Sequence, residues 1–388
     1  MILKPKHSAS SINIFTTMTN LARQENAWNL SQGLPDYPIA PELAEMLKEA
    51  VVDGYNQYPP MPGLVYLREN ISRELNFRYT TNFCTPEVVT ITPGATYAIF
   101  TALTCLINPG DEVIYLEPAF DCYLPAIEIV GGIPVKVTLD AFNNFELDWQ
   151  MIKDAISPKT KAILINTPHN PTGYVWTQKD WNQLAQLIDG KNIYIISDEV
   201  YDSIVFDGIR HLPGFLQSSL KDKVISIYSF GKTFHITGWK IGYVVASKEI
   251  TTAFRSVHQY LTFSVNSPGQ FALAKYLEIY TPGEATSLLQ AKRDLLINHL
   301  ENSALKKLNT SAGTYFQLYD YSATSNLPDT EFAKWLTIEY KVATIPLSAF
   351  FKEVQKHKLI RLCFAKKDEV LIQAALQLNK IKSVKTNM

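Results

Sequence analysis

The stretch SFGKTFHITGWK, residues 229–240, contains Lys232, a residue whose amine could take part in chemistry. Its Gly-Lys-Thr tripeptide is typical of nucleotide-binding P-loops, but that motif requires a glycine five residues before the Gly-Lys pair. Ser226 occupies the required position, inside VISIYSF, whose alternation of apolar and polar residues predicts the end of a β-strand. The loop is therefore too short to cradle phosphates, and Lys232 needs a different function.

Polar residues that could do chemistry also follow three other predicted strands. One strand ends at Gly94-Ala95-Thr96, where a helix begins, and another ends at Asn166, shortly before Asn170. A third ends at Asp198, with Tyr201 three residues later. Each group alone could be only a turn, a helix cap or a solvated surface residue. Because ligands bind beyond the carboxyl ends of strands in an open parallel sheet, we expect these groups to surround one crevice.

This set of groups matches the parts of pyridoxal 5′-phosphate (PLP). A helix N-terminus binds a phosphate through its free N–H groups and its dipole. A carboxylate can hold a proton on a ring nitrogen, and a phenol and an amide can hydrogen-bond a ring oxygen. A lysine whose pKa is lowered by cationic neighbours can form a Schiff base with an aldehyde. The sequence therefore predicts a PLP site.

The elements that must position these residues follow an α/β order. From about residue 87 to residue 250, apolar runs of strand length alternate with helical patterns, which predicts a mostly parallel sheet with helices on both faces. After residue 280, one long helix over 282–304, with Pro282 in its first turn, precedes a small α+β pattern. The segment 12–24 also has a helical pattern.

We therefore expect three parts. Residues 1–40 form an N-terminal helix and an arm that packs with the small domain and the active site. Residues 41–281 form a large PLP-binding domain, and residues 282–388 form a small α+β C-terminal domain.

Composition narrows the class of protein. The 388 residues are 46% hydrophobic and 19% charged with a net charge of −1, which is typical of a globular enzyme and argues against nucleic-acid or membrane partners. The four cysteines lack CxxC spacing, which favours free buried thiols, and the seven histidines lack the paired spacing of a metal site. The start MILKPKHSASS lacks the apolar core of a signal peptide, and no run is long enough to span a bilayer. We expect a cytoplasmic protein.

Nine motifs, in order and spread over nearly the whole chain, resemble those of the class I/II (fold type I) PLP-dependent aminotransferases. They are NLSQGLPD, NQYPPMPG, ITPGATYAIF, NTPHNPTG, ISDEVY, SFGKTFHITGWKIGY, VHQYLTFSVNSP, GTYF and LIRLCFAKK. Within that family the resemblance is closest to the bacterial methionine aminotransferases. It implies a large domain with a mostly parallel seven-stranded sheet flanked by helices, plus a small α+β domain.

The resemblance also implies roles for the residues at matching positions. Lys232 would bind PLP covalently, Asp198 would face the ring nitrogen, and Tyr201 would bond the ring oxygen together with Asn170. Phe120 would stack on the ring. The remaining residues would hold the phosphate: Ala95, Thr96, Ser229, Lys240 and, reaching over from the partner subunit of a homodimer, Tyr58.

For the substrate, Arg361 would bind the α-carboxylate, helped by Asn170 and the Gly33 backbone. The apolar residues on both sides of Arg361 favour a half-buried position over a surface ion pair. Apolar walls for the side chain would come from Ile14, Phe15, Tyr37 and the partner's Phe263, although these residues could equally only pack the N-terminal helix. We find no second arginine at a matching position, so methionine or an aromatic donor is favoured over aspartate.

Two positions depart from the family pattern. Lys240 stands where arginine is common, which keeps the positive charge without a bidentate fork, and the members that act on methionine and kynurenine share this lysine. His235 stands where a small residue is usual, and we assign it no role.

The predicted reaction is a ping-pong transfer of an amino group to a 2-oxo acid, in which Lys232 moves the proton at the substrate Cα. A cysteine-S-conjugate or cystathionine β-lyase, a kynurenine- or glutamine-type aminotransferase and an inactive binding protein stay open as alternatives. A DNA-binding regulator of this fold would need a winged helix, for which the roughly thirty residues before LSQG leave no room.

Overall fold

The computed structural model describes residues 13–353 and 356–383. Its helices are α1 (Ile14–Gln24), α2 (Pro41–Val52), α3 (Val65–Tyr79), α4 (Ala95–Leu106), α5 (Tyr123–Ile129), α6 (Trp149–Ala155), α7 (Gln178–Leu187), α8 (Phe230–Thr233), α9 (Lys248–Leu261), α10 (Ser267–Ile279), α11 (Glu284–His299), α12 (Asp329–Glu339) and α13 (Asp368–Leu378). Its strands are β1 (Trp28–Asn29), β2 (Val89–Thr92), β3 (Glu112–Glu117), β4 (Ile133–Thr138), β5 (Thr160–Asn166), β6 (Tyr194–Asp198), β7 (Val224–Ser229), β8 (Gly242–Ala246), β9 (Lys306–Lys307), β10 (Phe316–Asp320), β11 (Val342–Ala343), β12 (Ile345–Pro346) and β13 (Leu359–Cys363).

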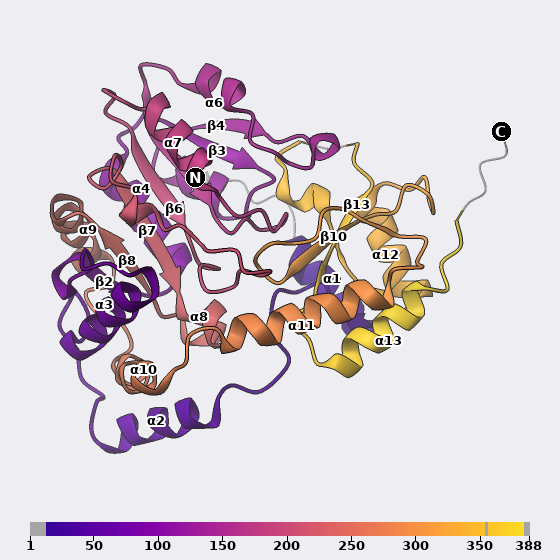
Figure 1. Cartoon of the computed structure of the whole chain (residues 1–388), viewed down its shortest axis with the longest axis horizontal. Helices are drawn as coiled ribbons and strands as arrows, with labels where there is room; N and C mark the ends of the chain where they lie inside the picture. The colour runs from indigo at the N-terminus through magenta and orange to yellow at the C-terminus, as the bar shows by residue number, and fades with distance from the viewer. Residues whose placement is uncertain (1–12, 354–355, 384–388) are drawn as a thin grey trace, which may run out of the picture.

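Seven strands form one sheet, the large sheet, in the order β2-β8-β7-β6-β5-β3-β4 (Figure 1). All neighbours are parallel except β8, which runs antiparallel to both β2 and β7. The register pairs Ser229, at the end of β7, with Gly242, at the start of β8. This arrangement confirms the predicted mostly parallel seven-stranded sheet flanked by helices.

The strands of the large sheet are apolar because both faces are covered. In β3, Val113 and Tyr115 pack in a cluster with α4, α5 and α9, whereas Ile114 and Leu116 pack in a cluster with α6 and α7. Successive side chains point to opposite faces, so a strand buried on both faces needs an unbroken apolar run.

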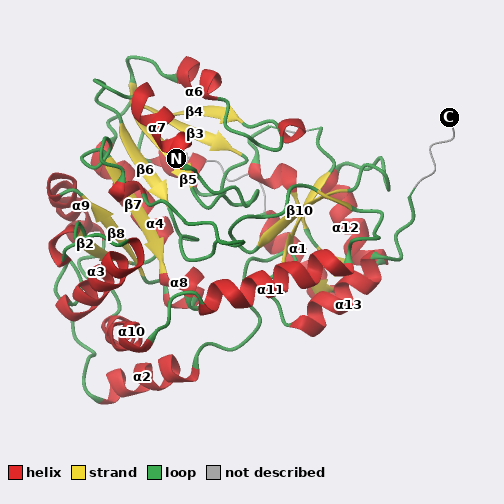
Figure 2. Ribbon diagram, in the orientation of Figure 1, coloured by secondary structure: helices red, strands yellow, loops and turns green. Residues whose placement is uncertain are grey.

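Four strands form a second sheet, the small sheet, in the order β12-β13-β10-β9 with antiparallel pairing (Figure 2). The N-terminal segment joins this region, because β1 pairs in parallel with β11. The predicted helix over 12–24 is confirmed as α1, while residues 1–12 lie outside the described part of the chain. Helix α11 runs from the large-sheet region toward α13 beside the small sheet (Figure 1).

Two elements differ from the sequence-based expectation. Helix α11 begins at Glu284 behind Gly283, which caps it with a φ of 103°, so Pro282 precedes the helix and does not lie in its first turn. Strand β4 lacks the continuous apolar run from which the other strands of the large sheet are predicted, because it lies at the edge of the sheet and its burial is incomplete, with Ile133 exposed. An edge strand does not need the continuous apolar run that marks its neighbours.

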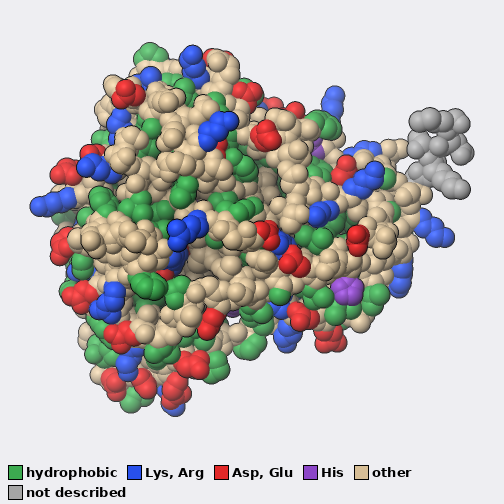
Figure 3. Space-filling view, viewed as in Figure 1, with side chains coloured by type: hydrophobic (Ala, Val, Ile, Leu, Met, Phe, Trp, Pro, Cys, Tyr) green, Lys and Arg blue, Asp and Glu red, His purple; other side chains and the backbone are tan. Residues whose placement is uncertain are grey.

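The surface has no large area of one charge on the face shown in Figure 3, where Lys and Arg alternate with Asp and Glu. Within the described ranges, no helix combines the length and the apolar character needed to cross a membrane, and no group of His, Cys, Asp and Glu is placed to hold a metal ion. The four cysteines are free as predicted; Cys84 and Cys363 are buried, but Cys105 and Cys122 are only half-buried.

Candidate active site

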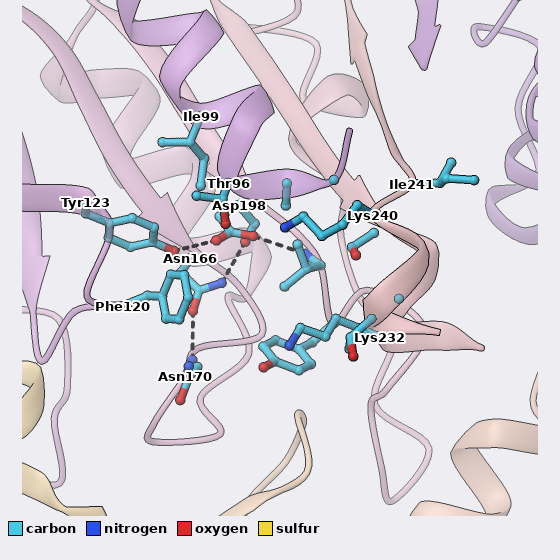
Figure 4. Close-up of a pocket in the computed structure, with 17 residues that line it drawn as sticks. Thr96, Ile99, Phe120, Tyr123, Asn166, Asn170, Asp198, Lys232, Lys240 and Ile241 are labelled. Carbon is cyan, nitrogen blue, oxygen red and sulfur yellow. Dashed lines mark hydrogen bonds between the residues drawn. The ribbon is translucent and has the colours of Figure 1, made fainter. Parts of the chain in front are cut away.

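A cavity of about 210 Å³ lies where β5, β6 and β7 end and α4 begins (Figure 4). The residues predicted for the cofactor that line it are Ala95, Thr96, Phe120, Asn170, Asp198, Tyr201, Ser229, Lys232 and Lys240. They come from strand ends that are up to 145 residues apart in sequence, between Ala95 and Lys240. The expectation of a single crevice at these strand ends is therefore met.

Asp198 is buried and lines this cavity. The Tyr123 hydroxyl donates to Oδ2 of Asp198 over 2.5 Å, and the backbone N–H of Val200 donates to Oδ1 over 3.3 Å (Figure 4). Burial raises the pKa of Asp198 to about 6, although both hydrogen bonds and the positive charge of Lys232 act in the opposite direction. Among the described residues Asp198 forms no ion pair, so a cation reaching it would meet a buried carboxylate that accepts hydrogen bonds but has no charged partner.

Lys232 lies across the cavity from Tyr123, on the short helix α8 that follows β7 directly (Figure 4). Its Nζ is 5.8 Å from the ring centroids of both Tyr201 and Tyr315. Burial lowers the pKa of Lys232 to about 8, and Arg361 adds to this effect while Asp198 opposes it. Burial is therefore the main cause of the lowered Lys232 pKa, whereas the sequence suggested that cationic neighbours would lower it.

One end of the cavity is suited to an anion. Gly94, which precedes α4, has a φ of 82°, a conformation that favours glycine, and the first N–H groups of the helix are free to bind. A Cβ on Gly94 would lie 3.6 Å from Nζ of Lys240, so this ammonium group lies beside the helix N-terminus. Thr96 and Ser229 add hydroxyl groups to the same cavity.

Asn170 connects the cavity to Arg361. Its backbone N–H donates to Oδ1 of Asn166 over 2.7 Å, and its side-chain Oδ1 accepts from Nη1 of Arg361 over 2.8 Å. The neighbouring His169 is buried and bonds Thr172 and the Pro118 carbonyl, with burial lowering the pKa of His169 to about 4. Hydrogen bonds with Asn166, Pro118 and the charged Arg361 thus fix the loop that carries Asn170.

Arg361 is only 2% exposed, which corrects the expectation of a half-buried position. The reason is a surround of aromatic rings: Cζ lies 3.7 Å from the ring centroid of Phe316, 4.8 Å from that of Phe350 and 5.5 Å from that of Phe15. Nη2 donates to the Ser31 carbonyl over 3.1 Å, whereas Nε has no partner in the part of the chain that the structure describes. Burial lowers the pKa of Arg361 to about 10, which leaves it charged at neutral pH.

Several predicted residues do not line this cavity. Tyr58 is 83% exposed and contacts Phe263 edge to face, with 5.6 Å between ring centroids. Ile14 and Phe15 pack against the apolar cluster around α6, α7 and Phe350. Gly33 accepts a hydrogen bond from Tyr315 at its carbonyl, and the Tyr37 hydroxyl contacts His235. Their assigned roles stay predictions.

Sequence reasoning missed two residues that hold the predicted groups in place. Tyr123 follows Phe120 by three residues in EPAFDCY, across a turn in which the Tyr123 N–H donates to the Phe120 carbonyl over 3.1 Å, and both line the same cavity. Asn166 was seen only as a strand end, yet its side chain bonds both the Asp198 carbonyl and the Asn170 N–H. The available signal was position: Asn166 begins the motif NTPHNPTG, and Tyr123 lies three residues after Phe120, which was assigned to the cofactor ring.

Comparison with known proteins decides the family. The family model for aminotransferase class I and II matches residues 25–378. The chain belongs to this family. It is therefore a PLP-dependent aminotransferase, an enzyme that acts on amino acids and 2-oxo acids.

Individual relatives cover nearly the whole aminotransferase. The methionine aminotransferase of Escherichia coli is 46% identical over 371 residues, which are 95% of each chain. A kynurenine–oxoglutarate transaminase of Dictyostelium discoideum is 34% identical and covers 98% of this chain and 97% of its own. A crystal structure of an E. coli protein with a methionine aminotransferase function matches with a TM-score of 0.94 and 44% identity, covering 98% and 100% of the two chains.

The cavity of the aminotransferase fits PLP by its donor set. A helix N-terminus and Lys240 suit a phosphate, and the buried carboxylate of Asp198 suits a protonated ring nitrogen. The half-buried Lys232 amine, which has no hydrogen-bond partner among the described residues, suits an aldehyde.

Proposed function

We propose that this aminotransferase transfers the amino group of methionine, or of an aromatic or large apolar amino acid, to a 2-oxo acid by a ping-pong mechanism. The observation that carries the proposal is that Lys232 and Asp198 line one cavity and that Arg361 bonds Asn170 at the edge of it, in a chain 46% identical to a methionine aminotransferase. The kynurenine transaminase relative makes kynurenine the alternative donor to test.

We propose the following roles around the cofactor. When bound, PLP accepts the amino group and spreads the negative charge that develops at the substrate Cα. Lys232 would hold the cofactor covalently and, once displaced by the substrate, would move the proton at Cα. Its pKa of about 8 leaves part of the amine unprotonated at neutral pH, as a base requires. Asp198 would keep the ring nitrogen protonated, and the Tyr123 hydroxyl would orient its carboxylate.

The same cavity supports the remaining assignments. Tyr201 and the Asn170 amide would bond the ring oxygen, and Phe120 would stack on the ring. Ala95, Thr96, Ser229 and Lys240 would hold the phosphate.

The substrate carboxylate would bind at Arg361. This guanidinium is charged and buried, and Asn170 already fixes its orientation through Nη1. A buried cation with an unpartnered Nε strongly favours an anionic ligand. Gly33 would add its backbone, because Tyr315 holds that segment beside the small sheet.

A donor panel tests the substrate class. With PLP-loaded enzyme and several 2-oxo acids, we expect methionine, phenylalanine and tyrosine to react at least about tenfold faster than aspartate in kcat/KM, because a charged side chain would lose its hydration without a matched cation. Methionine amide, which lacks the carboxylate, is the matched control and should be a poor donor. Aspartate as the best donor would refute the proposal. Kynurenine as the best donor would favour the alternative, and pyruvate and ammonia formed from cystathionine without an acceptor would favour a β-lyase.

We also propose a homodimer with shared active sites, in which Tyr58 reaches the cofactor phosphate of the other subunit. An exposed aromatic surface supports it: Tyr58, Tyr260 and Phe263 are 83%, 85% and 46% exposed, and Tyr58 and Phe263 touch. We expect Tyr58→Phe to weaken PLP binding about tenfold or more, since one hydrogen bond to a charged group is lost.

Subunit mixing gives the decisive measurement for this arrangement. Homodimers of Tyr58→Phe and of Lys232→Ala are each impaired, but a mixed dimer would contain one site with both residues intact. Activity that rises as subunits exchange would support shared sites. A monomer by light scattering, or no gain on mixing, would contradict them.

We further propose the domain division 1–40, 41–281 and 282–388, supported by the separate strand composition of the two sheets and by the pairing of β1 with β11. A cytoplasmic location is supported by four free cysteines and is checked by cell fractionation.

A further inference from the structure

The segment 33–38, here called the arm, is fastened to the small-sheet region by three hydrogen bonds. The Tyr315 hydroxyl donates to the Gly33 carbonyl over 2.8 Å, and Nζ of Lys366 donates to the Leu34 carbonyl over 2.5 Å. The Lys367 backbone N–H donates to the Asp36 carboxylate over 2.6 Å. The arm follows Ser31, whose carbonyl accepts from Arg361, so its position and that of the guanidinium are linked.

The side chain of Tyr37 makes the connection to the segment that carries Lys232. Its hydroxyl lies 3.2 Å from Nε2 of His235, and the two rings meet edge to face with 4.5 Å between centroids. His235 follows Lys232 by three residues and has a φ of 61°, a left-handed conformation that is uncommon outside glycine. The contact therefore joins residues 198 positions apart at a backbone geometry that the fold must hold in place.

A third element closes around the same tyrosine. Nζ of Lys292, on α11, lies 5.1 Å from the Tyr37 ring centroid, and it forms an ion pair with Asp368 on α13 over 2.9 Å. Lys292 is buried, so its charge faces the Tyr37 ring at close range. Burial lowers the pKa of His235 to about 4, with Lys292 adding to the effect, and burial raises the pKa of the Tyr37 hydroxyl above its ordinary value. Both partners of the hydrogen bond are thus neutral at neutral pH.

We propose that Tyr37 and His235 form a latch that positions the arm and Arg361 relative to Lys232. This inference rests on the proposed function only in placing the substrate carboxylate at Arg361. The carboxylate and the Cα proton belong to one substrate, so the groups that bind them must keep a fixed separation. The arm is fastened beside Arg361, and Lys232 lies on α8, directly after strand β7 of the large sheet. The latch joins the two. His235 and Tyr37 are positioning residues, because they act through the arm and the Lys232 segment.

A double-mutant cycle tests the latch. The variants are Tyr37→Phe, which removes only the hydroxyl, and His235→Gly, which removes the ring at a φ that glycine adopts without strain. We expect kcat/KM for any accepted amino donor to fall about tenfold in each single variant, mainly through a higher KM. The double variant should lose no more kcat/KM than the more impaired of the two single variants. PLP affinity, measured by absorbance titration, should change by less than about twofold. Tyr340→Phe, which alters a ring that packs on Trp335, and His299→Ala, at the end of α11, are the controls.

Hydrogen–deuterium exchange gives a readout that does not depend on activity. In both single variants of the PLP-loaded enzyme, backbone amides of residues 33–38 should exchange faster, while those of β5 and β6 stay protected. Additive losses in kcat/KM, or unchanged exchange in the arm, would overturn the latch. A failure of methionine as donor would leave the exchange result intact, so the two proposals fail separately. If His235→Gly does not fold, Tyr37→Phe and His235→Asn carry the test.

Discussion

Lys232→Ala is expected to abolish the visible absorbance band of lysine-bound PLP and to lower turnover by about four orders of magnitude or more. Two functions would be lost together, because in our proposal the Lys232 amine both attaches the cofactor and moves the proton at the substrate Cα. The structure leaves no obvious substitute: Lys240 also lines the cavity, but its ammonium group lies beside the N-terminus of α4, at the anion end. Spectra and single-turnover rates of the purified variant measure both effects.

Adding small amines to Lys232→Ala separates the covalent attachment of the cofactor from the transfer of the Cα proton. Added methylamine or ethylamine should restore part of the turnover of Lys232→Ala, because a free amine can enter a cavity that the alanine enlarges. Lys334→Ala, an exposed residue on α12, is the matched control and should leave the spectrum unchanged. An unaltered visible band in Lys232→Ala would rule out the covalent role.

Asp198→Asn should lower kcat/KM by about 10²- to 10³-fold, the scale of losing one preorganised electrostatic group. The substitution keeps the shape and leaves an oxygen for the Tyr123 hydroxyl, but it removes the charge that would hold the ring nitrogen protonated. Because Asp198 is buried, solvent cannot supply an equivalent negative charge. Steady-state kinetics with the best donor, at saturating PLP, measure this loss of kcat/KM.

Two comparison variants make this result specific. Asp189→Asn changes an exposed carboxylate and should be neutral. Tyr123→Phe leaves the charge of Asp198 but removes a hydrogen bond to it, so its loss should be smaller than that of Asp198→Asn. Near-normal turnover in Asp198→Asn would show that the carboxylate does not act on the ring.

The sequence was most informative where a chemical residue directly follows a buried strand. Asp198, Ser229 and Asn166 each end a strand of the large sheet, and parallel strands bring such ends to one edge. Their convergence could therefore be predicted from periodicity alone. Their chemical identities then matched a family pattern that extends over most of the chain.

What the sequence could not show depends on packing between distant segments. The burial of Arg361 comes from three phenylalanine rings on separate elements, and apolar flanks in one strand could indicate only partial burial. The contact between Tyr37 and His235 joins two loops whose approach no local pattern encodes. The dominant cause of the lowered Lys232 pKa was missed for the same reason, because the depth of a side chain is a property of the assembled fold.

The reversed direction of β8 has a consequence for the spacing of the two lysines in the cavity. Lys232 and Lys240 lie on the connection between β7 and β8. Ser229, at its start, pairs with Gly242, at its end, so that the two ends of the connection lie side by side in the large sheet. The connection that carries the proposed covalent anchor and the proposed phosphate ligand is thereby fixed at both ends by main-chain hydrogen bonds. Residues between the two lysines, such as His235, can therefore vary while the strand pairing keeps the ends of the connection in place.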